Sequence, residues 1–186
     1  MIDARPIEEA GQKALQTQRQ LFYDGWLLRV SPGSAKRARS VNAHFGSTLP
    51  LDEKIAHCER VYGERELPAL FRITPFVHPA DLEGALARRG YRPFQPTLVQ
   101  AMELVGREIP SQGPAEVDLV EPSIDAFTDA VAALRGSPPG QRDALRERLV
   151  HSPLDGRHVL ALVDGAPVAA GKTARERDVV GVFDVV

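Results

Sequence analysis

Three strand-like segments near the C-terminus lie too close together in the sequence to be parallel. A short Asp-Gly turn separates residues 159–163 from residues 168–173, and five residues then precede the third segment, residues 179–186. A crossover between parallel strands needs about a dozen residues or more, whereas two to five residues suffice for a hairpin. The spacing therefore predicts an antiparallel meander of three strands, and the other elements must be ones that can cover such a sheet.

The same spacing decides how a relaxed phosphate-loop pattern is interpreted. Residues 166–173, APVAAGKT, end like a P-loop, and residues 179–184 form an apolar run that ends in aspartate. A P-loop lysine begins a helix that returns to a parallel strand, and five residues are too few for that crossover. We therefore interpret residues 166–173 as a strand. The sequence has neither the G-x-G-x-x-G nor the G-x-S-x-G pattern.

Helix-like and strand-like patterns alternate through the rest of the chain. Helices are predicted at residues 6–19, 51–63, 78–90, 123–136 and 141–150, and strands at residues 25–30, 36–43, 70–74, 97–104 and 117–120. A hairpin is predicted between the first two of these strands, because turn residues separate them. Together the elements predict an α/β (α+β) fold of mixed, mostly antiparallel sheets flanked by helices.

A segment rich in proline and glycine, residues 106–115, separates two differently patterned regions. Such composition is typical of a linker. We expect residues 1–105 and residues 116–186 to form two packed sub-structures.

Composition excludes several classes of protein. The chain has 23 Lys and Arg against 25 Asp and Glu, a net charge of −2, which gives no overall attraction for nucleic acid or membranes. The single cysteine, Cys58, cannot form an intrachain disulfide and is expected in the core rather than as a nucleophile. The five histidines lack metal-ligand spacing, and no apolar stretch is long enough to span a membrane. We expect a cytoplasmic protein without a metal.

One local cluster of positive charge stands out from this balance. Arg29, Lys36, Arg37 and Arg39 lie within eleven residues that contain no acid. Such a cluster is more often a solvated strand face than a binding site, and no series of aromatic residues accompanies it for nucleic-acid stacking. If it binds a ligand, a small phosphate-bearing molecule is favoured over a nucleic acid.

The order from Glu116 onward, a strand, two helices and a meander, resembles the first half of the GNAT superfamily of N-acetyltransferases. The segments LALVDGAPVAAG and VGVFDVV are similar to that family's second to fourth strands. Earlier segments are similar to the leading region of GNAT-like proteins with an extra N-terminal module: DGWLLRV, KRARSVN, LPLDEKI, FRITPF and RGYRPFQPTLV. Residues 1–105 also resemble the family's back half in element order, which indicates a degenerate internal duplication.

The resemblance implies transfer of an acetyl group from acetyl-CoA to an amine, either a small molecule or a peptide. In the family, the backbone of the fourth strand binds pantetheine and polarises the thioester. That strand corresponds to residues 179–186, so Phe183, Val185 and Val186 become the expected cofactor contacts. Asp184 becomes the candidate base that deprotonates the amine. The alternative for Asp184 is an ordinary carboxylate at a sheet edge.

An acceptor cleft is expected between the two halves of the chain, lined by Trp26, Arg29, Arg39 and Phe71. Tryptophan and arginine side chains on strands could stack on an anionic acceptor and neutralise it. The alternative is that Trp26 and Phe71 are core residues, as strand aromatics often are.

The family's pyrophosphate loop, Q/R-x-x-G-x-G/A, should follow the fourth strand, but the sequence ends first. Two explanations stay open: a longer natural protein, or a remnant that acts as a non-catalytic binding module. Because the loop supplies the backbone N–H groups for the pyrophosphate, we expect this chain alone not to bind acetyl-CoA tightly. The edge at residues 179–186 could also permit self-association.

Overall fold

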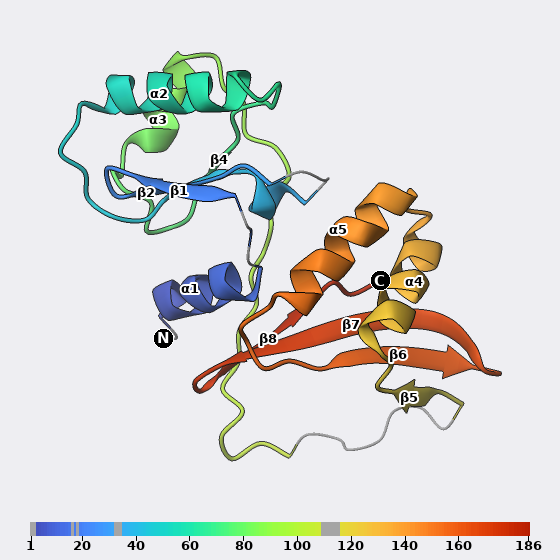
Figure 1. Ribbon diagram of the computed structural model, residues 1–186. Helices are drawn as coiled ribbons and strands as arrows, with labels where there is room; N and C mark the ends of the chain where they lie inside the picture. Colours follow the sequence, from blue (N-terminus) through green and yellow to red (C-terminus); the bar gives the residue numbers. More distant parts are fainter. Residues whose placement is uncertain (1–2, 16, 18, 32–34, 109–115) are drawn as a thin grey trace. The chain divides into compact units, whose positions relative to one another are not determined.

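The computed structural model describes residues 3–15, 17, 19–31, 35–108 and 116–186. Within these residues the chain forms five α-helices and two four-stranded sheets, one mixed and one antiparallel (Figure 1). This architecture confirms the predicted α+β fold class. No helix in the described ranges is long and apolar enough to cross a membrane.

The chain divides into two compact units, which are described separately below. Residues 17–100 form one, here called the central unit, and residues 1–16 with 101–186 form the other, here called the terminal unit. This division differs from the predicted one at the N-terminus, where the first helix belongs with the C-terminal sheet. Of the predicted linker at residues 106–115, residues 109–115 lie outside the described residues. The position of the predicted boundary between residues 105 and 116 stays a prediction.

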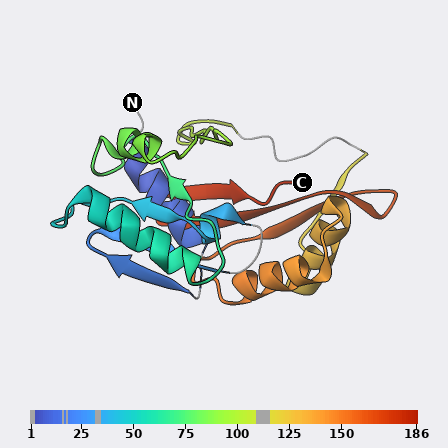
Figure 2. The same ribbon diagram turned by 90° about the horizontal axis from the view of Figure 1, so that it is seen from above.

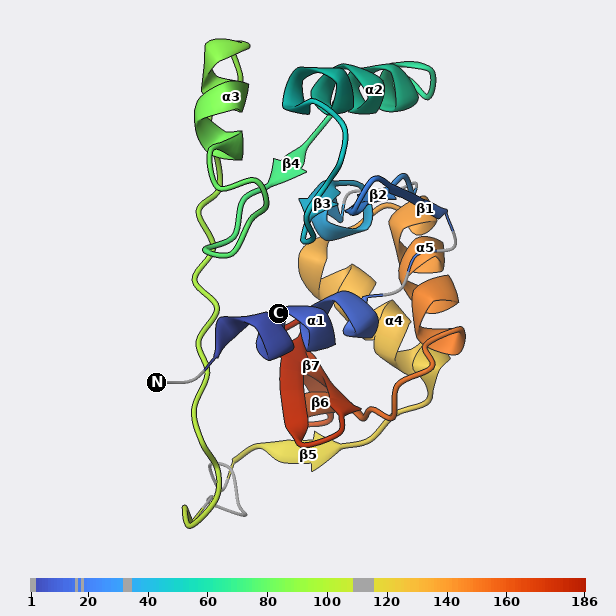
Figure 3. The same cartoon turned by 90° about the vertical axis from the view of Figure 1, so that its left-hand side faces the viewer.

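The central unit is a four-stranded sheet with two helices on one side. Its strands are β1 (Gln20–Tyr23), β2 (Trp26–Arg29), β3 (Val41–Ala43) and β4 (Phe71–Arg72), in that order across the sheet. Only the pairing of β3 with β4 is parallel. Helices α2 (Leu51–Gly63) and α3 (Leu82–Arg88) complete the unit with the short 3-10 helix η1 (Lys36–Ala38). Figures 1 and 3 both show α2 on one side of the sheet.

Strand alternation explains the core of the central unit. Trp26 and Leu28 on β2 point to the same side of the sheet, and Val41 lies opposite Leu28 on β3. These side chains are buried against apolar side chains of the two helices, including Ile55 and Leu82. Because both the strands and the helices present an apolar face here, the unit closes around one hydrophobic core.

The first hairpin differs from its predicted form. As expected, β2 pairs with β3, but β2 also pairs with β1, a strand that was not predicted. The turn between β1 and β2 is Asp24-Gly25, and both residues have positive φ angles, 41° and 82°. A Cβ atom on Gly25 would lie 2.3 Å from the carbonyl oxygen of Gly46, so glycine is required at this position. Part of the second predicted strand is η1, because residues 36–38 turn before β3 begins.

The predicted strand at residues 97–104 is wrong. Residues 92–104 form neither helix nor strand, and Leu98 is 89% exposed. Alternating apolar side chains favour a strand only where a neighbouring strand supplies hydrogen bonds and a face to pack on. No such neighbour pairs with this segment among the described residues.

The terminal unit contains the predicted meander. Its strands are β5 (Asp118–Val120), β6 (His158–Val163), β7 (Ala166–Glu176) and β8 (Val179–Phe183), all antiparallel and in sequence order. Figure 2 shows β6, β7 and β8 as adjacent orange-red strands. Since residues 166–173 lie within β7, the P-loop interpretation is excluded.

Three helices pack on this sheet: α1 (Ala4–Ala14), α4 (Ile124–Arg135) and α5 (Pro139–Val150). The Ser123 hydroxyl accepts a hydrogen bond from the Ala126 N–H at 3.2 Å, and Gly136, with φ of 60°, ends α4. Both ends of α4 were predicted from these residue types, and both are confirmed. The core joins α4 and α5 to the strands through Phe127, Val131, Leu145, Leu149, Leu160 and Ala170.

Candidate functional site

The chain makes a β-bulge at Asp184, directly after β8. Phe183 lies opposite Lys172 on β7. Two residues earlier on β7, Ala170 exchanges backbone hydrogen bonds of 2.9 and 3.0 Å with Val186. Between these two pairs the chain advances three residues from Phe183 to Val186 but only two residues from Lys172 to Ala170. The segment after β8 therefore contains one extra residue, which defines a bulge. Asp184 has the positive φ, 53°, and we assign the extra residue to it.

The bulge determines which backbone groups face away from the sheet. The hydrogen bonds between Ala170 and Val186 show that the backbone groups of these two residues point toward each other. By alternation, Phe183 and Val186 direct their backbone groups toward β7, whereas Val182 and Val185 direct theirs outward. Among the described strands β8 is at the edge of its sheet. Of the three predicted cofactor contacts, Val185 is thus the one whose backbone faces outward.

Two cations hold the Asp184 carboxylate. The Lys172 ammonium lies 3.3 Å from Oδ2, and the Arg135 guanidinium lies 3.8 Å from Oδ1. Lys172 is only 7% exposed, although lysine is rarely buried without full compensation. Asp184 is therefore the centre of a charged cluster rather than an isolated acid, a point that the sequence analysis could not establish.

His158 lies in the same cross-strand row as Lys172 and Phe183. It lies opposite Lys172 in the register of β6 and β7, and its ring centre is 4.9 Å from that of Phe127. Burial, followed by the charge of Lys172, lowers the pKa of His158, while Asp184 acts in the opposite direction. The imidazole is consequently neutral at pH 7 and able to accept a proton.

A further arginine, Arg148 on α5, approaches this cluster. Its charge is attracted by Asp184 and repelled by Arg135, and burial is the main cause of its lowered pKa. In the part of the chain that the structure describes, its guanidinium makes neither a hydrogen bond nor an ion pair, although the residue is half-buried. We define the Asp184 cluster as Asp184, Lys172, Arg135, Arg148 and His158.

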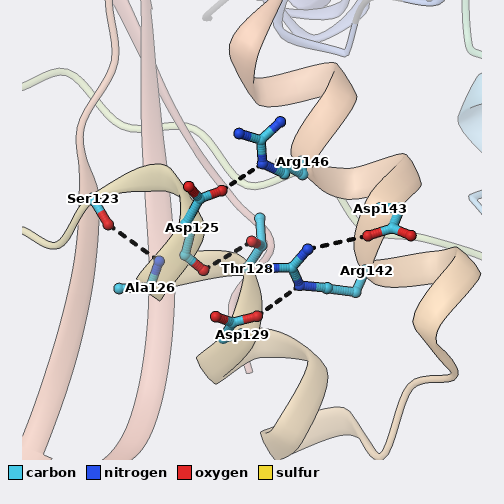
Figure 4. Close-up of polar contacts among 8 residues, drawn as sticks. All are labelled: Ser123, Asp125, Ala126, Thr128, Asp129, Arg142, Asp143 and Arg146. Atoms are coloured by element: carbon cyan, nitrogen blue, oxygen red, sulfur yellow. Dashed lines mark hydrogen bonds and ion pairs between the residues drawn. The ribbon is translucent and has the colours of Figure 1, made fainter.

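Two ion pairs join α4 to α5, the helix that carries Arg148. Arg142 donates to Asp129 at 2.6 Å, and one turn further along α5 Arg146 donates to Asp125 (Figure 4). The hydrogen bond from Arg146 lowers the pKa of Asp125. These contacts run along the exposed side of the two helices and link them in an antiparallel arrangement.

The structure does not bring the four predicted acceptor residues onto one face. Trp26 is fully buried, and its ring centre lies 6.1 Å from that of Phe71. The Trp26 indole N–H also donates to the His78 carbonyl at 3.0 Å, so both aromatics belong to the core, as in the alternative interpretation. Arg29 is three positions from Trp26 on the same strand and points to the opposite face.

Two arginines of the basic cluster, Arg29 and Arg39, are more buried than side chains on a solvated face would be, whereas Lys36 is exposed. Arg29 is 4% exposed, and burial, followed by repulsion from Arg37, lowers its pKa to about 10. Arg39 is half-buried. The predicted acceptor cleft between the halves stays a prediction.

A second buried lysine, Lys54, lies in the central unit. Its ammonium donates to the Asp24 backbone carbonyl at 2.6 Å and lies 3.2 Å from the Asp24 carboxylate. It also lies 4.1 Å from the centre of the Trp26 ring. Asp24 accepts hydrogen bonds from the backbone N–H groups of Leu49 and Thr48, which lower its pKa well below the usual range. This arrangement ties the first hairpin to the start of α2.

The structure places Cys58 in the core of the central unit, which confirms that prediction. Burial raises the pKa of its thiol to about 12, so it stays protonated at neutral pH and is a poor nucleophile. The described residues contain no group of three or more side chains that could hold a metal ion.

Four members of the Asp184 cluster were missed by sequence reasoning: Lys172, Arg135, Arg148 and His158. One signal was present for Lys172. On a strand Lys172 shares a face with Ala170 and Ala174, and both alanines are buried. A lysine between two buried apolar residues on one face is unusual and indicates a special role. The other three come from separate elements, and only the fold brings them near Asp184.

No protein-family model, no curated protein and no solved structure matches this chain.

Proposed function

We propose that the terminal unit is the thioester-binding part of a GNAT-type N-acyltransferase, which transfers an acetyl group from acetyl-CoA to an amine. The bulge at Asp184 carries this proposal, because it interrupts the regular ladder of β8 and turns backbone groups outward at a sheet edge. The element order supports it: β5, α4, α5 and then the meander β6 to β8 follow the order that the resemblance implies.

The outward backbone groups of Val182 and Val185 suit an extended amide chain. Pantetheine contains two amides, and a ligand of that kind can lie along an edge strand much as an added strand does. A backbone N–H at the same edge can donate to a thioester carbonyl and stabilise the charge that develops on its oxygen. Phe183 and Val186 would contribute side-chain contacts, because their backbone groups face β7.

Two groups of the cluster could accept the proton of the amine. Asp184 is the candidate from the resemblance, but its two carboxylate oxygens already lie 3.3 Å from Lys172 and 3.8 Å from Arg135. His158 is neutral at pH 7 and lies opposite Lys172, the ion-pair partner of Asp184, so it is the stronger candidate for this role.

A second candidate function is that of a non-catalytic binding module. Val180 and Val182 on the edge strand are exposed, 49% and 68% respectively. An exposed apolar edge strand favours pairing with another chain, including a second copy of this one.

The experiment is a nuclear magnetic resonance titration of the chain with acetyl-CoA at millimolar concentration, since only weak binding is expected. The acyltransferase proposal requires saturable shifts of the Val182 and Val185 amide signals. Val182→Pro removes an outward N–H and should weaken binding about tenfold, whereas Val182→Ala keeps the N–H and should bind normally. Absence of saturable shifts in the wild-type chain, or equal binding by both variants, would contradict the proposal. Concentration-dependent dimerisation through β8 would support the binding module.

A further inference from the structure

We infer that Arg148, Arg135 and Lys172 form a binding site for an anionic group, a carboxylate or a phosphate, beside Asp184. If the proposed acyltransferase function holds, this group belongs to the acceptor, which is then an amine that carries a negative charge. The anion site itself does not depend on that function.

The first argument is the balance of charge in the cluster. Three cations, from α4, α5 and β7, approach one carboxylate, and His158 is neutral. The other acid that acts on Arg148 is Glu147, which is exposed, so water screens its charge. An excess of positive charge in a partly buried place is unfavourable by itself and attracts an anion.

The second argument is the hydrogen-bonding capacity that the cluster leaves unused. Lys172 has three N–H donors, yet within the described residues its single polar contact is the ion pair of 3.3 Å with Asp184. Arg148 has five donors and makes neither a hydrogen bond nor an ion pair in the same ranges. A planar guanidinium matches the two oxygens of a carboxylate or phosphate, so Arg148 is the expected primary contact.

The third argument comes from the neighbouring arginines of α5. Arg142 and Arg146 each have a carboxylate partner on α4 (Figure 4). Arg148, two residues further along the same helix, lies about 200° around the helix axis from Arg146 and has no such partner in the described part of the chain. The arginine of α5 without a partner is thus the one whose charge is attracted by Asp184.

The test uses the whole chain and two probes, inorganic phosphate and succinate, titrated under calorimetric or nuclear magnetic resonance detection at constant ionic strength. We expect saturable binding of at least one probe, and the better one identifies the anion class. Arg148→Gln should weaken this binding at least tenfold. Arg146→Gln, which removes an equal charge from the exposed side of the same helix, should change it less than twofold. Circular dichroism must show both variants folded.

Three results would overturn the inference: no saturable binding of either probe, unchanged binding by Arg148→Gln, or an equal loss in Arg146→Gln. The outcome is independent of the acetyl-CoA titration, which monitors the outward edge of β8. If acetyl-CoA fails to bind while phosphate or succinate binds through Arg148, the acyltransferase proposal fails and the anion site stands. If acetyl-CoA binds and neither anion does, the acceptor has no need of a negative charge.

Discussion

The two units each bury a lysine, and they compensate its charge differently. Lys54 in the central unit is 0% exposed and has a carbonyl oxygen, a carboxylate and an aromatic face within contact distance. Lys172 in the terminal unit is nearly as buried, but it has one ion pair, to a carboxylate that Arg135 also approaches.

The difference separates a structural charge from one that is available to a ligand. A buried cation with every donor occupied holds chain segments together, and removing it leaves its partner uncompensated. A buried cation with unused donors is less well compensated within the chain, and those donors can bind an anion from outside it. Variants in the two units can test this contrast and extend it to other residues, and the largest expected effect comes first.

The largest effect is expected for Lys54→Met. The variant keeps the volume but leaves the Asp24 carboxylate beside an apolar side chain, and it should lower the free energy of unfolding by about 3 kcal/mol. Urea unfolding followed by circular dichroism measures this. Lys13→Met is the control, because Lys13 is exposed and paired at the surface with Glu176. An equal decrease in the free energy of unfolding in the two variants would contradict the structural role assigned to Lys54.

The next effect compares the two Asp-Gly turns. Gly25 and Gly165 both have positive φ, 82° and 77°, but a Cβ on Gly25 would collide with the Gly46 carbonyl, whereas nothing lies within 4 Å of one on Gly165. Gly165→Ala should cost about 1 kcal/mol of backbone strain. Gly25→Ala should cost about 2 kcal/mol more, because it also displaces the hairpin that carries Asp24. Similar unfolding midpoints for the two variants would contradict the close packing at Gly25.

Lys172→Met should change stability by less than about 1 kcal/mol, in either direction, because Asp184 keeps Arg135 as a partner. The same variant should weaken phosphate or succinate binding. A loss of stability comparable to that of Lys54→Met would show that Lys172 is a structural residue, and the contrast between the two lysines would disappear.

The smallest effect is a dependence of stability on pH that arises from His158. Its pKa is lowered in the folded state, so between that value and the unfolded value of about 6.5 the unfolded chain binds more protons. The stabilisation is fully present above pH 6.5 and declines as the pH falls toward the folded pKa. Unfolding curves at several pH values should show this decline, and His158→Gln should reduce it. His151→Gln, at an exposed position, should leave the dependence intact.

Local signals predicted most of the fold. Ser123 and Gly136 marked the ends of α4, and the short connections around Asp164 predicted the antiparallel meander; all three are confirmed. The strand expected at residues 97–104 failed because alternation describes a side-chain pattern, not the presence of a pairing partner. β1 was missed because only four residues belong to it and the preceding pattern favours a helix.

The candidate site was much less predictable. Asp184 was selected through a resemblance, but its partners lie 12 and 49 residues earlier, on different elements. Spacing along one chain carries no information about which faces meet after folding. The bulge could not be predicted either, because an aspartate at the end of a strand is equally typical of a turn and of an ordinary edge residue.

The burial of Cys58 and Trp26 has a practical consequence. They are the chain's single cysteine and single tryptophan, and both belong to the core of the central unit. Indole fluorescence and thiol alkylation therefore report on the central unit alone, because the terminal unit contains neither tryptophan nor cysteine. Alkylation requires the thiol to reach reagent, so its rate in native buffer gives the frequency with which the central unit opens. Fluorescence and alkylation thus measure unfolding of the central unit, whereas circular dichroism measures unfolding of the whole chain. Comparing them would show whether the two units unfold together or one after the other.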